Sequence, residues 1–349
     1  MENQNLSSYY RCPSNIALVK YWGKKNGAAQ IPANPSISIN LSDLYAETKV
    51  TIQHGNVSGL PAFSFLLDGQ SKNSFHSKIE TFFKRIWQEF EVVRNFHLHI
   101  ESRNNFPHGT GIASSAAGFG ALALCICDLE QQVTGKVFPN FEQEASKIAR
   151  LGSGSACRSI LPNLVEWGEH SEVSNSSNLH AIEILKPEKG NGFPLMDIVL
   201  IVDAGEKKVS SSEGHSLLDA NPYSEVRYEV AVKNITNLIH AIRRDNMRSI
   251  ISIVESEALQ LHAMMMVSSP YYMLFRPNTV AIIEKVWEFR EKSSLPVMFT
   301  LDAGANVHLL FPELYRTQIV NFIETELLPF CQNGLYFCSA TGAAPVKLN

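Results

Sequence analysis

Five short segments of the sequence carry side chains whose types and spacing suit phosphate or proton chemistry. The first is the small-residue run at 107–118, which lies between an alternating stretch and an apolar one and predicts a loop that opens a helix. Successive backbone N–H groups at such a helix start bind phosphate oxygens, and small side chains let the backbone come close. The run is neither a Walker A loop nor a G-x-G-x-x-G fingerprint. Its composition fits a phosphate loop and a tightly packed Ala/Gly helix with a serine cap equally well.

A second segment, residues 152–159, combines two glycines, three serines and an arginine. If a helix begins near Ser155, then Ser155 and Arg158 lie three apart on one face. Hydroxyls beside a guanidinium suit an anion, because arginine is a planar two-pronged donor to carboxylate or phosphate. Taken alone, a Gly-Ser turn with a surface arginine is the commoner interpretation.

The third segment, residues 15–24, places basic and phenolic groups at the end of a strand-like run. Lys20 ends the run, and Tyr21 and Lys24 follow it. Two lysines and a phenol at a strand end could clamp a diphosphate. Solvated lysines beside a half-buried aromatic pair are the ordinary alternative.

The last two segments lie in the second half of the chain. In residues 299–307, Asp302 follows an apolar strand-like run and precedes small residues, so its carboxylate could face a pocket as a general base. An Asp-Ala-Gly turn is the plain alternative. Residues 206–214 are basic and then hydroxyl-rich, which suits a phosphate but also describes an exposed loop.

The elements that must position these side chains are a mixture of strands and helices. Alternating apolar and polar residues predict strands at 36–41, 48–52 and 96–101, and a β-rich apolar run predicts another at 196–202. Helical spacing predicts helices at 76–90, at 141–151 with Gly152 as the stop, at 226–242 and at 249–266. There is no strict βαβ alternation, so we expect an α+β fold. The Lys/Pro/Gly-rich stretch at 186–194 predicts a linker, with domains at 1–190 and 191–349 and the site in the cleft between them.

Composition excludes several classes of function. The 349 residues carry a net charge of −4 without a basic stripe, so nucleic acid is not an expected partner. The most apolar stretch, residues 112–129, contains two serines and ends near Asp128, which predicts a buried helix rather than a membrane span. The first eleven residues lack the apolar run of a signal peptide, and the six cysteines show no metal spacing. We therefore expect reduced thiols and a cytoplasmic protein with no membrane partner.

In this order and spacing the five segments resemble one enzyme family, the mevalonate diphosphate decarboxylases. The resemblance rests on Asn-Ile-Ala-x-x-Lys-Tyr-Trp-Gly-Lys at 15–24, Gly-Ile-Ala-Ser-Ser-Ala-Ala-Gly at 111–118, Gly-Ser-Gly-Ser-Ala-Cys-Arg-Ser at 152–159, Lys-Lys-Val-Ser-Ser at 207–211 and Asp-Ala-Gly-x-Asn at 302–306. The family belongs to the superfamily of galactokinase, homoserine kinase, mevalonate kinase and phosphomevalonate kinase. The first and third blocks are characteristic of the decarboxylase branch.

The resemblance implies a fold and partners. The first domain is expected to resemble ribosomal protein S5 domain 2 and the second to be ferredoxin-like, with residues 335–344 able to pack back on the first domain. The implied reaction is ATP-dependent decarboxylation of mevalonate 5-diphosphate to isopentenyl diphosphate. The implied cofactors are ATP and Mg²⁺, with the ion bound through phosphates rather than by a protein metal site. A homodimer is implied by the family alone.

The resemblance also implies roles for individual residues. The catalytic residues would be Asp302, beside the tertiary 3-hydroxyl; Lys20, between Asp302 and the γ-phosphate; and Arg158, on the C1 carboxylate. The substrate would contact Tyr21, Trp22, Gly23, Lys24, Ser153, Gly154, Ser155, Ala156, Cys157, Arg158 and Ser212. The ATP phosphates would contact Gly109, Gly111, Ser114, Ser115, Ala116 and Ser211.

Departures from the family pattern and neighbouring activities leave alternatives open. His108 replaces a small or hydroxyl residue, Pro35 a serine, Ala305 a proline and Ser212 a threonine, and Lys72 is a candidate for the basic residue in the helix before the loop. None of these touches Lys20, Asp302 or Arg158. The alternatives are a phosphomevalonate decarboxylase, a mevalonate 3-kinase and a non-catalytic binding protein on the same fold.

Overall fold

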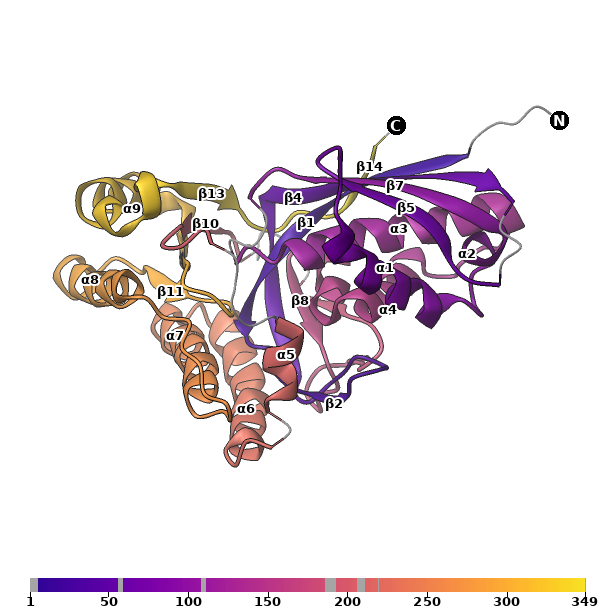
Figure 1. Cartoon of the computed structure of the whole chain (residues 1–349). Coiled ribbons are helices and arrows are strands. Elements are labelled where there is room, and N and C mark those ends of the chain that lie inside the picture. Colours follow the sequence, from indigo (N-terminus) through magenta and orange to yellow (C-terminus); the bar gives the residue numbers. More distant parts are fainter. Residues whose placement is uncertain are drawn as a thin grey trace.

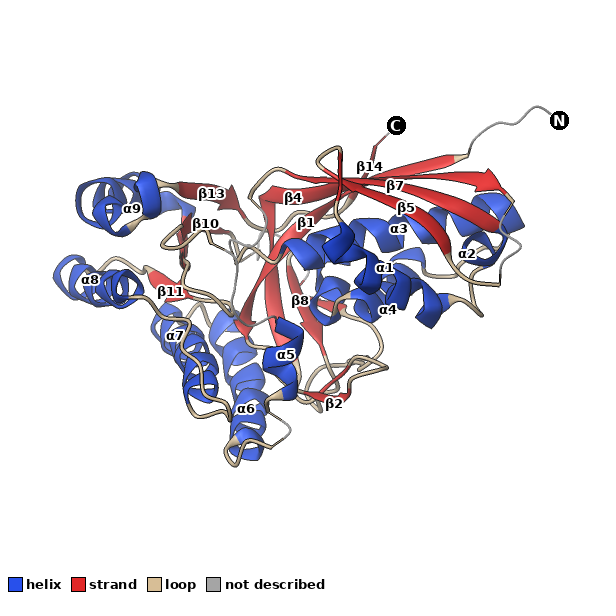
Figure 2. Cartoon of the chain, viewed as in Figure 1, coloured by secondary structure: helices blue, strands red, loops and turns tan. Residues whose placement is uncertain are grey.

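The computed structural model has two domains, each built on its own sheet (Figure 1). It describes residues 6–55, 59–107, 111–185, 193–205, 211–218 and 220–348. The α+β class expected from the sequence is confirmed, because both domains combine sheets with helices (Figure 2). The expected boundary near residue 190 falls in 186–192, outside the described residues.

The first sheet follows the order β14-β1-β4-β7-β5-β6, and β8 joins it by pairing with β4 and β9. Its strands are β1 (Ser7–Val19), β4 (Ser36–His54), β5 (Ala62–Leu67), β6 (Gln70–Ser71), β7 (Phe96–Asn104), β8 (Leu164–Trp167), β9 (Ile182–Leu185) and β14 (Val346–Leu348). The pairs are antiparallel except β5 with β7. On one side of the sheet lie α1 (Asn73–Ile86), α2 (Glu91–Asn95), α3 (Ser114–Thr134) and α4 (Phe141–Gly152) (Figure 1). A small separate ribbon pairs β2 (Lys24–Asn26) with β3 (Ile31–Pro32).

The helices of the first domain form where an apolar stripe can be buried against the sheet. In α1 the buried residues are Ile79, Phe82, Phe83 and Ile86, at helical spacing. The helix expected at 76–90 runs from Asn73 to Ile86, and a turn follows in which the N–H groups of Glu89 and Phe90 bond to the Ile86 carbonyl. Phe90 is still fully buried, so its place in the apolar pattern reflects core packing from a turn.

The long strand β4 departs from the simplest interpretation of its sequence. Two strands were expected at 36–41 and 48–52, and the structure has a single strand through both. The polar members of the alternation, Ser36, Ser38 and Asn40, are fully buried rather than solvated. Their face is covered by the segment that contains Arg158, which both serines contact. Both faces of this part of the sheet are therefore interior.

The second sheet has the order β11-β12-β10-β13 with all pairs antiparallel. Its strands are β10 (Leu195–Leu200), β11 (Met298–Thr300), β12 (Val307–Pro312) and β13 (Tyr336–Ala340). The long helices between β10 and β11 are α6 (Ser224–Arg243), α7 (Met247–Met266) and α8 (Pro277–Ser293), preceded by the short α5 (Ser211–Ser216). In chain order this is strand 4-1-3-2, so the expected ferredoxin-like arrangement is confirmed.

The remaining helical segments are short. They are η1 (Gly154–Ile160), η3 (Glu313–Tyr315), α9 (Arg316–Phe322), η4 (Ile323–Leu327), η5 (Leu328–Phe330) and η6 (Gln332–Gly334). The end of the chain crosses between domains: β13 belongs to the second sheet, Thr341 bridges to Leu41, and β14 pairs with β1. Within the described residues, no helix is long and apolar enough to cross a membrane. The apolar stretch at 112–129 is the buried helix α3.

Candidate active site

Lys20 and Asp302 form an ion pair between the two domains. Lys20 directly follows β1, Asp302 lies two residues after β11, and the Lys20 Nζ donates to Asp302 Oδ1 at 3.1 Å. The Lys20 side chain is 2% exposed, whereas that of Asp302 is 28% exposed. The pair therefore offers a reachable carboxylate backed by a buried ammonium group.

The charges around Lys20 act on its pKa in opposite directions. Burial lowers the pKa of Lys20 below its ordinary value, because the charged ammonium loses its hydration. The carboxylates of Asp302 and Glu257 counteract this lowering, and the guanidinium of Arg158 adds to it. The charge of Lys20 thus depends on the carboxylates that surround it.

The loop that carries Asp302 is held through its main chain. His262 on α7 donates from Nε2 to the Asp302 carbonyl at 3.1 Å. Thr279 at the start of α8 donates to the carbonyl of Ala305 at 2.7 Å, so the residue that departs from the family's proline is still anchored. Asn306 accepts from the N–H groups of residues 202 and 203 at 2.7 and 2.9 Å. These contacts fix the position of the loop, and with it the position of the Asp302 carboxylate relative to Lys20.

Arg158 lies fully inside the molecule beside this pair. It belongs to η1, and it donates from Nε to Ser38 Oγ at 3.0 Å and from Nη1 to Ser36 Oγ at 2.6 Å. Within the described residues no carboxylate is in ion-pair contact with it, and burial lowers its pKa. A buried guanidinium without an ion-pair partner among these residues is costly, which suits it to binding an anion. Sequence reasoning missed Ser36 and Ser38 because their alternation indicated a solvated strand face.

Tyr21, the residue after Lys20, packs beside the start of η1. Tyr21 lies against Gly154, where an added Cβ would come within 2.7 Å of the Tyr21 Oη, and its ring meets Trp167 edge-on at 4.7 Å. The Tyr21 hydroxyl is buried with no hydrogen-bond partner among the described residues. Burial raises its pKa, so it remains a neutral donor. A donor in this position is available to a phosphate oxygen.

His215 on α5 contacts the segment that follows Lys20. Its ring lies 4.4 Å from the rings of both Tyr21 and Trp22, and its Nδ1 accepts from the N–H of Gly23 at 2.9 Å. Trp22 is buried in a cluster with Leu218, so its main chain is the part that can face a ligand. Gly23 has φ of +95°, and a Cβ there would collide with the Tyr228 hydroxyl at 2.2 Å. Only glycine fits this turn.

The contact of His215 with Gly23 predicts a difference between two substitutions of matched shape. His215→Asn keeps an acceptor at the position of Nδ1, whereas His215→Leu leaves the Gly23 N–H buried without one. We expect His215→Leu to be less stable than His215→Asn by about 1–3 kcal/mol in urea unfolding at neutral pH. Equal stability of the two variants would contradict this hydrogen bond.

The wild-type protein should also lose stability in acid through His215. Burial, with a smaller effect of Lys24, lowers the pKa of His215 from 6.5 to about 3. The unfolded chain binds the proton first, so this part of the stability is present above pH 6.5 and is lost as the pH falls toward 3. Both variants lack the imidazole, and their stability should fall less over that interval.

The remaining predicted substrate residues lie around the start of η1. Ser153 and Ser155 are partly exposed, and they flank Gly154. Ala156 and Cys157 are fully buried, and the Cys157 thiol donates to the Gly154 carbonyl at 3.0 Å, so their side chains serve packing. The side chain of Ser212, like that of Ser211, lies outside the described residues.

Basic side chains gather close to this segment. Burial and the charge of Arg85 on α1 lower the pKa of Lys24. Burial also lowers the pKa of Arg150, and Arg85 lowers it further. Arg85 and Arg150 donate to backbone carbonyls, and none of the three is in an ion pair with a carboxylate among the described residues. Sequence reasoning missed both arginines, because each is an ordinary basic residue in the last turn of a helix. Uncompensated cations at one place favour a highly charged anion.

The small-residue loop leads into α3 as predicted. The helix begins at Ser114 after the N-cap residue Ala113, which has φ of +43° and makes no side-chain capping hydrogen bond. Ser115 is exposed and Ala116 is buried. Gly111 has φ of +84°, and a Cβ there would lie 4.0 Å from the Cβ of Asn306, so the loop runs close to the segment of Asp302. Gly109 and His108 lie outside the described residues.

A pocket opens beside the start of α3. Its walls come from β5, β7, α1 and α3, and they include Phe65, Leu67, Phe75, Lys78, Ser114 and Ser115. The candidate basic residue Lys72 is exposed and precedes the first residue of α1. Lys78, one turn into the same helix, is the lysine that lines the pocket. In the sequence, the only indication of this was that Lys78 stands next to Ile79, which belongs to the apolar stripe of the helix.

Two family models together match most of the chain. Residues 12–178 match the diphosphomevalonate decarboxylase-like N-terminal domain, and residues 197–348 match the mevalonate 5-diphosphate decarboxylase C-terminal domain. The diphosphomevalonate decarboxylase of Gibberella zeae is 30% identical over 319 residues, which cover 86% of this chain and 80% of that protein. The diphosphomevalonate decarboxylase of Saccharomyces cerevisiae is 29% identical over 328 residues, which cover 89% of this chain and 79% of that protein.

Solved structures of related proteins share the whole fold. Mevalonate diphosphate decarboxylase from Staphylococcus aureus superimposes with a TM-score of 0.83 at 28% identity, covering 98% of each chain. A structure of MDDEF in complex with MVAPP, AMPPCP and magnesium gives a TM-score of 0.83 at 26% identity, covering 98% of this chain and 99% of that one. The mevalonate diphosphate decarboxylase from Legionella pneumophila gives a TM-score of 0.80 at 26% identity, covering 95% of this chain and 100% of that one.

Proposed function

Because this chain belongs to the diphosphomevalonate decarboxylase family, we propose that it converts mevalonate 5-diphosphate to isopentenyl diphosphate at the expense of ATP. The observation that carries the proposal is the Lys20–Asp302 pair beside the buried Arg158. Together they supply a reachable carboxylate, an ammonium group and an anion-binding guanidinium, all at the junction of the two domains. The balanced reaction consumes ATP and mevalonate diphosphate and releases ADP, phosphate, CO₂ and isopentenyl diphosphate.

The carboxylate of Asp302 and the ammonium group of Lys20 act on the phosphorylation of the tertiary 3-hydroxyl. Asp302 orients this hydroxyl and accepts its proton as the oxygen attacks the γ-phosphorus of ATP. Lys20 offsets the negative charge on the phosphoryl group while it is transferred. The new 3-phosphate then leaves with the C3–O bonding electrons. The C1–C2 bond breaks, its electrons form the C2–C3 double bond, and CO₂ departs.

Arg158 holds the carboxylate that becomes CO₂. Its guanidinium is fixed by Ser36 and Ser38, so it can accept the anion without reorganising. The diphosphate would bind to Tyr21 and Lys24 with the segment 153–155, where Tyr21 lies against Gly154. The nearby cations Arg85 and Arg150 favour two phosphates over one, which supports the diphosphate substrate against the monophosphate.

The start of α3 and the adjoining pocket are proposed to bind ATP. Uncapped N–H groups at a helix start bind phosphate oxygens, and the aromatic rings of Phe65 and Phe75 offer an apolar surface to a purine. Lys78 adds a positive charge at this place. Mg²⁺, when bound through the phosphates, neutralises part of their charge. The solved complex of MDDEF with AMPPCP and magnesium supports ATP and Mg²⁺ as the ligands.

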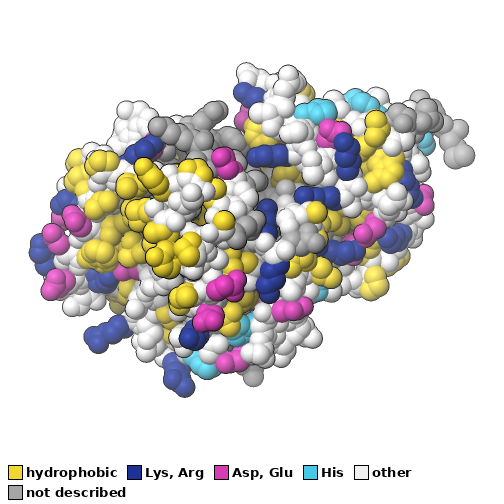
Figure 3. Space-filling model, turned by 60° about the horizontal axis from the view of Figure 1, so that its bottom comes forward, with side chains coloured by type: hydrophobic (Ala, Val, Ile, Leu, Met, Phe, Trp, Pro, Cys, Tyr) yellow, Lys and Arg dark blue, Asp and Glu magenta, His cyan; other side chains and the backbone are white. Residues whose placement is uncertain are grey.

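Side chains on the surface also bear on partners. In Figure 3, Lys and Arg side chains lie along the middle of the molecule, and hydrophobic side chains gather over the C-terminal domain. Exposed apolar residues of that domain include Tyr271, Met273 and Trp287. We keep the homodimer as a proposal from the family, to be checked by light scattering of the purified chain.

A paired assay tests the proposed reaction. Purified protein is given ATP, Mg²⁺ and mevalonate 5-diphosphate, and ADP and CO₂ are followed together. We expect equal release of both, and a lower kcat/KM with the 5-monophosphate. ADP without CO₂ would make the protein a 3-kinase, and preference for the monophosphate would overturn the substrate. Release of neither product from either substrate would support a non-catalytic protein.

A further inference from the structure

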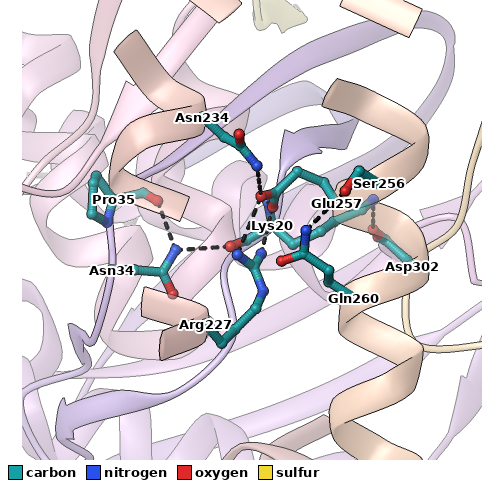
Figure 4. A network of polar contacts seen from close by, with 9 residues as sticks. All are labelled: Lys20, Asn34, Pro35, Arg227, Asn234, Ser256, Glu257, Gln260 and Asp302. Carbon is teal, nitrogen blue, oxygen red and sulfur yellow. Dashed lines mark hydrogen bonds and ion pairs between the residues drawn. The ribbon is translucent and has the colours of Figure 1, made fainter. Parts of the chain in front are cut away.

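The carboxylate of Glu257 is buried at the boundary between the domains, beside the main chain of Lys20. It lies on α7 and is fully inaccessible to solvent. Its Oε2 accepts from the main-chain N–H of Lys20 at 2.9 Å and from Arg227 of α6, and its Oε1 accepts from Asn234 at 2.6 Å (Figure 4). Burying a carboxylate at this depth is costly, and its four hydrogen bonds, two of them from Arg227, are the reason that it is tolerated.

The main chain of Lys20 is therefore held from both sides. Its N–H is bound by Glu257, and its carbonyl accepts from Asn34 Nδ2 at 2.9 Å. The side chain then extends from a fixed base toward Asp302, as Figure 4 shows. Lys20 has a flexible four-carbon stem, so anchoring its main chain removes much of the freedom of its Nζ.

The same helix also holds the other member of the ion pair. His262, little more than one turn after Glu257 on α7, donates to the main-chain carbonyl of Asp302. Its ring is stacked on Phe275 at 4.2 Å, which restrains the imidazole. Helix α7 of the second domain thus binds one peptide group beside Lys20 and one beside Asp302.

We propose that Glu257 and His262 are positioning residues, and that α7 sets the separation of Lys20 and Asp302 by binding the main chain of each. The proposal rests on the proposed function, in which this pair acts on the hydroxyl and the transferring phosphoryl group. Neither residue touches the reacting atoms. A helix spaces two hydrogen-bonding groups rigidly, and a misplacement of about 1 Å at a reacting pair costs on the order of 100-fold in rate.

Glu257 also contributes electrostatically to the same pair. The charged groups that face Lys20 are Asp302 from the loop after β11, Arg158 from η1 and Glu257 from α7. Glu257 is itself faced by Arg227, which screens part of its charge. Removing the charge of Glu257 removes one of the two carboxylates that raise the pKa of Lys20, the other being Asp302. The ammonium form should then be lost at a lower pH.

A neighbouring glutamate on the same helix provides a matched control. Glu255 is also buried, and it accepts from Arg290 at 2.6 Å, from Trp287 at 3.0 Å and from the N–H of Phe299 at 3.3 Å. It therefore resembles Glu257 in residue type, burial and ion pairing, but it has no contact with Lys20. Glu→Gln at either position keeps the shape and removes one charge.

The test compares Glu257→Gln with Glu255→Gln in the full-length protein. The titration of Lys20 is followed by ¹³Cε NMR of labelled lysine, with Lys20→Arg used to assign the signal. We expect Glu257→Gln to move the Lys20 titration and the basic limb of the kcat profile to lower pH, because the carboxylate of Glu257 raises the pKa of Lys20. Glu255→Gln should lower the stability of the protein and leave the Lys20 titration and the basic limb of the kcat profile unchanged.

Three results would overturn the proposal. These are an unchanged Lys20 titration in Glu257→Gln, an equal shift in Glu255→Gln, and a kcat in His262→Leu equal to that of the wild type. A merely structural glutamate would change stability without moving the titration. Because the NMR readout needs no turnover, its result stays separate from a failure of the proposed reaction, which the wild-type assay reports.

Discussion

Asp302→Asn should abolish most of the turnover while leaving the protein folded and able to bind its substrates. The amide has the shape of the carboxylate but cannot accept the proton of the 3-hydroxyl, so we expect kcat to fall by about 10²–10⁴-fold. The KM values for ATP and mevalonate diphosphate should change by no more than a few-fold, because Asp302 contacts neither the diphosphate nor the nucleotide in the proposed site. Initial rates of ADP and CO₂ release measure both quantities.

The loss of Asp302 should also be visible in Lys20. The ion pair is one of the effects that keep the buried ammonium charged, so removing the carboxylate lowers the pKa of Lys20 further. The penalty in stability is reduced by the partial exposure of Asp302. Circular dichroism and substrate titration are the controls for folding and binding. A variant that keeps more than about a tenth of the wild-type kcat would exclude Asp302 as the base.

The elements of the fold were largely predictable because their apolar patterns are local. The stripes of α1, α4, α6 and α7 and the alternation of β4 and β7 are each contained in a single stretch of sequence. Errors came where tertiary packing extended a pattern. Phe90 continues the apolar period of α1 but is buried from a turn, and Ser38 continues an alternation but faces the interior.

The site was predictable only through the order and spacing of its motifs. Lys20 and Asp302 are 282 positions apart, and no periodicity indicates that the ends of β1 and β11 meet. The resemblance supplied that relation, and the 3.1 Å contact in the structure agrees with it. The predicted roles of these residues in catalysis stay predictions until the variants are measured.

Supporting residues were missed because they act through the main chain or through another side chain. Glu257 lies in a helix whose sequence shows only an amphipathic pattern, and its partner is a peptide N–H that any residue would supply. His215 directly follows the serine-rich segment 206–214 and was not singled out, and its contact with Gly23 arises from tertiary packing. Signals of this kind have no fixed spacing, so a single sequence does not reveal them.

The second large effect is expected at Arg158, which we propose holds the carboxylate that leaves as CO₂. Arg158→Met keeps the length of the stem and removes the charge and the two-pronged donor. We expect kcat/KM for mevalonate diphosphate to fall by about 10²–10³-fold, the scale of one or two charge-assisted hydrogen bonds. The KM for ATP should change little. Arg158→Lys restores the charge without the planar fork, and it should recover only part of the loss.

A substrate that lacks the carboxylate separates this role from binding of the diphosphate. The affinities of the wild type and of Arg158→Met are measured for mevalonate diphosphate and for 3-hydroxy-3-methylbutyl diphosphate, which has the same hydroxyl and diphosphate but no C1 carboxylate. If Arg158 binds the carboxylate, the substitution weakens the first ligand and scarcely affects the second, with a coupling of about 1.5–3 kcal/mol. If Arg158 instead binds the diphosphate, both ligands weaken equally and the coupling vanishes. The first outcome is the one we expect, because Arg158 lies near Asp302, whereas Lys24, Arg85 and Arg150 are the cations assigned to the diphosphate.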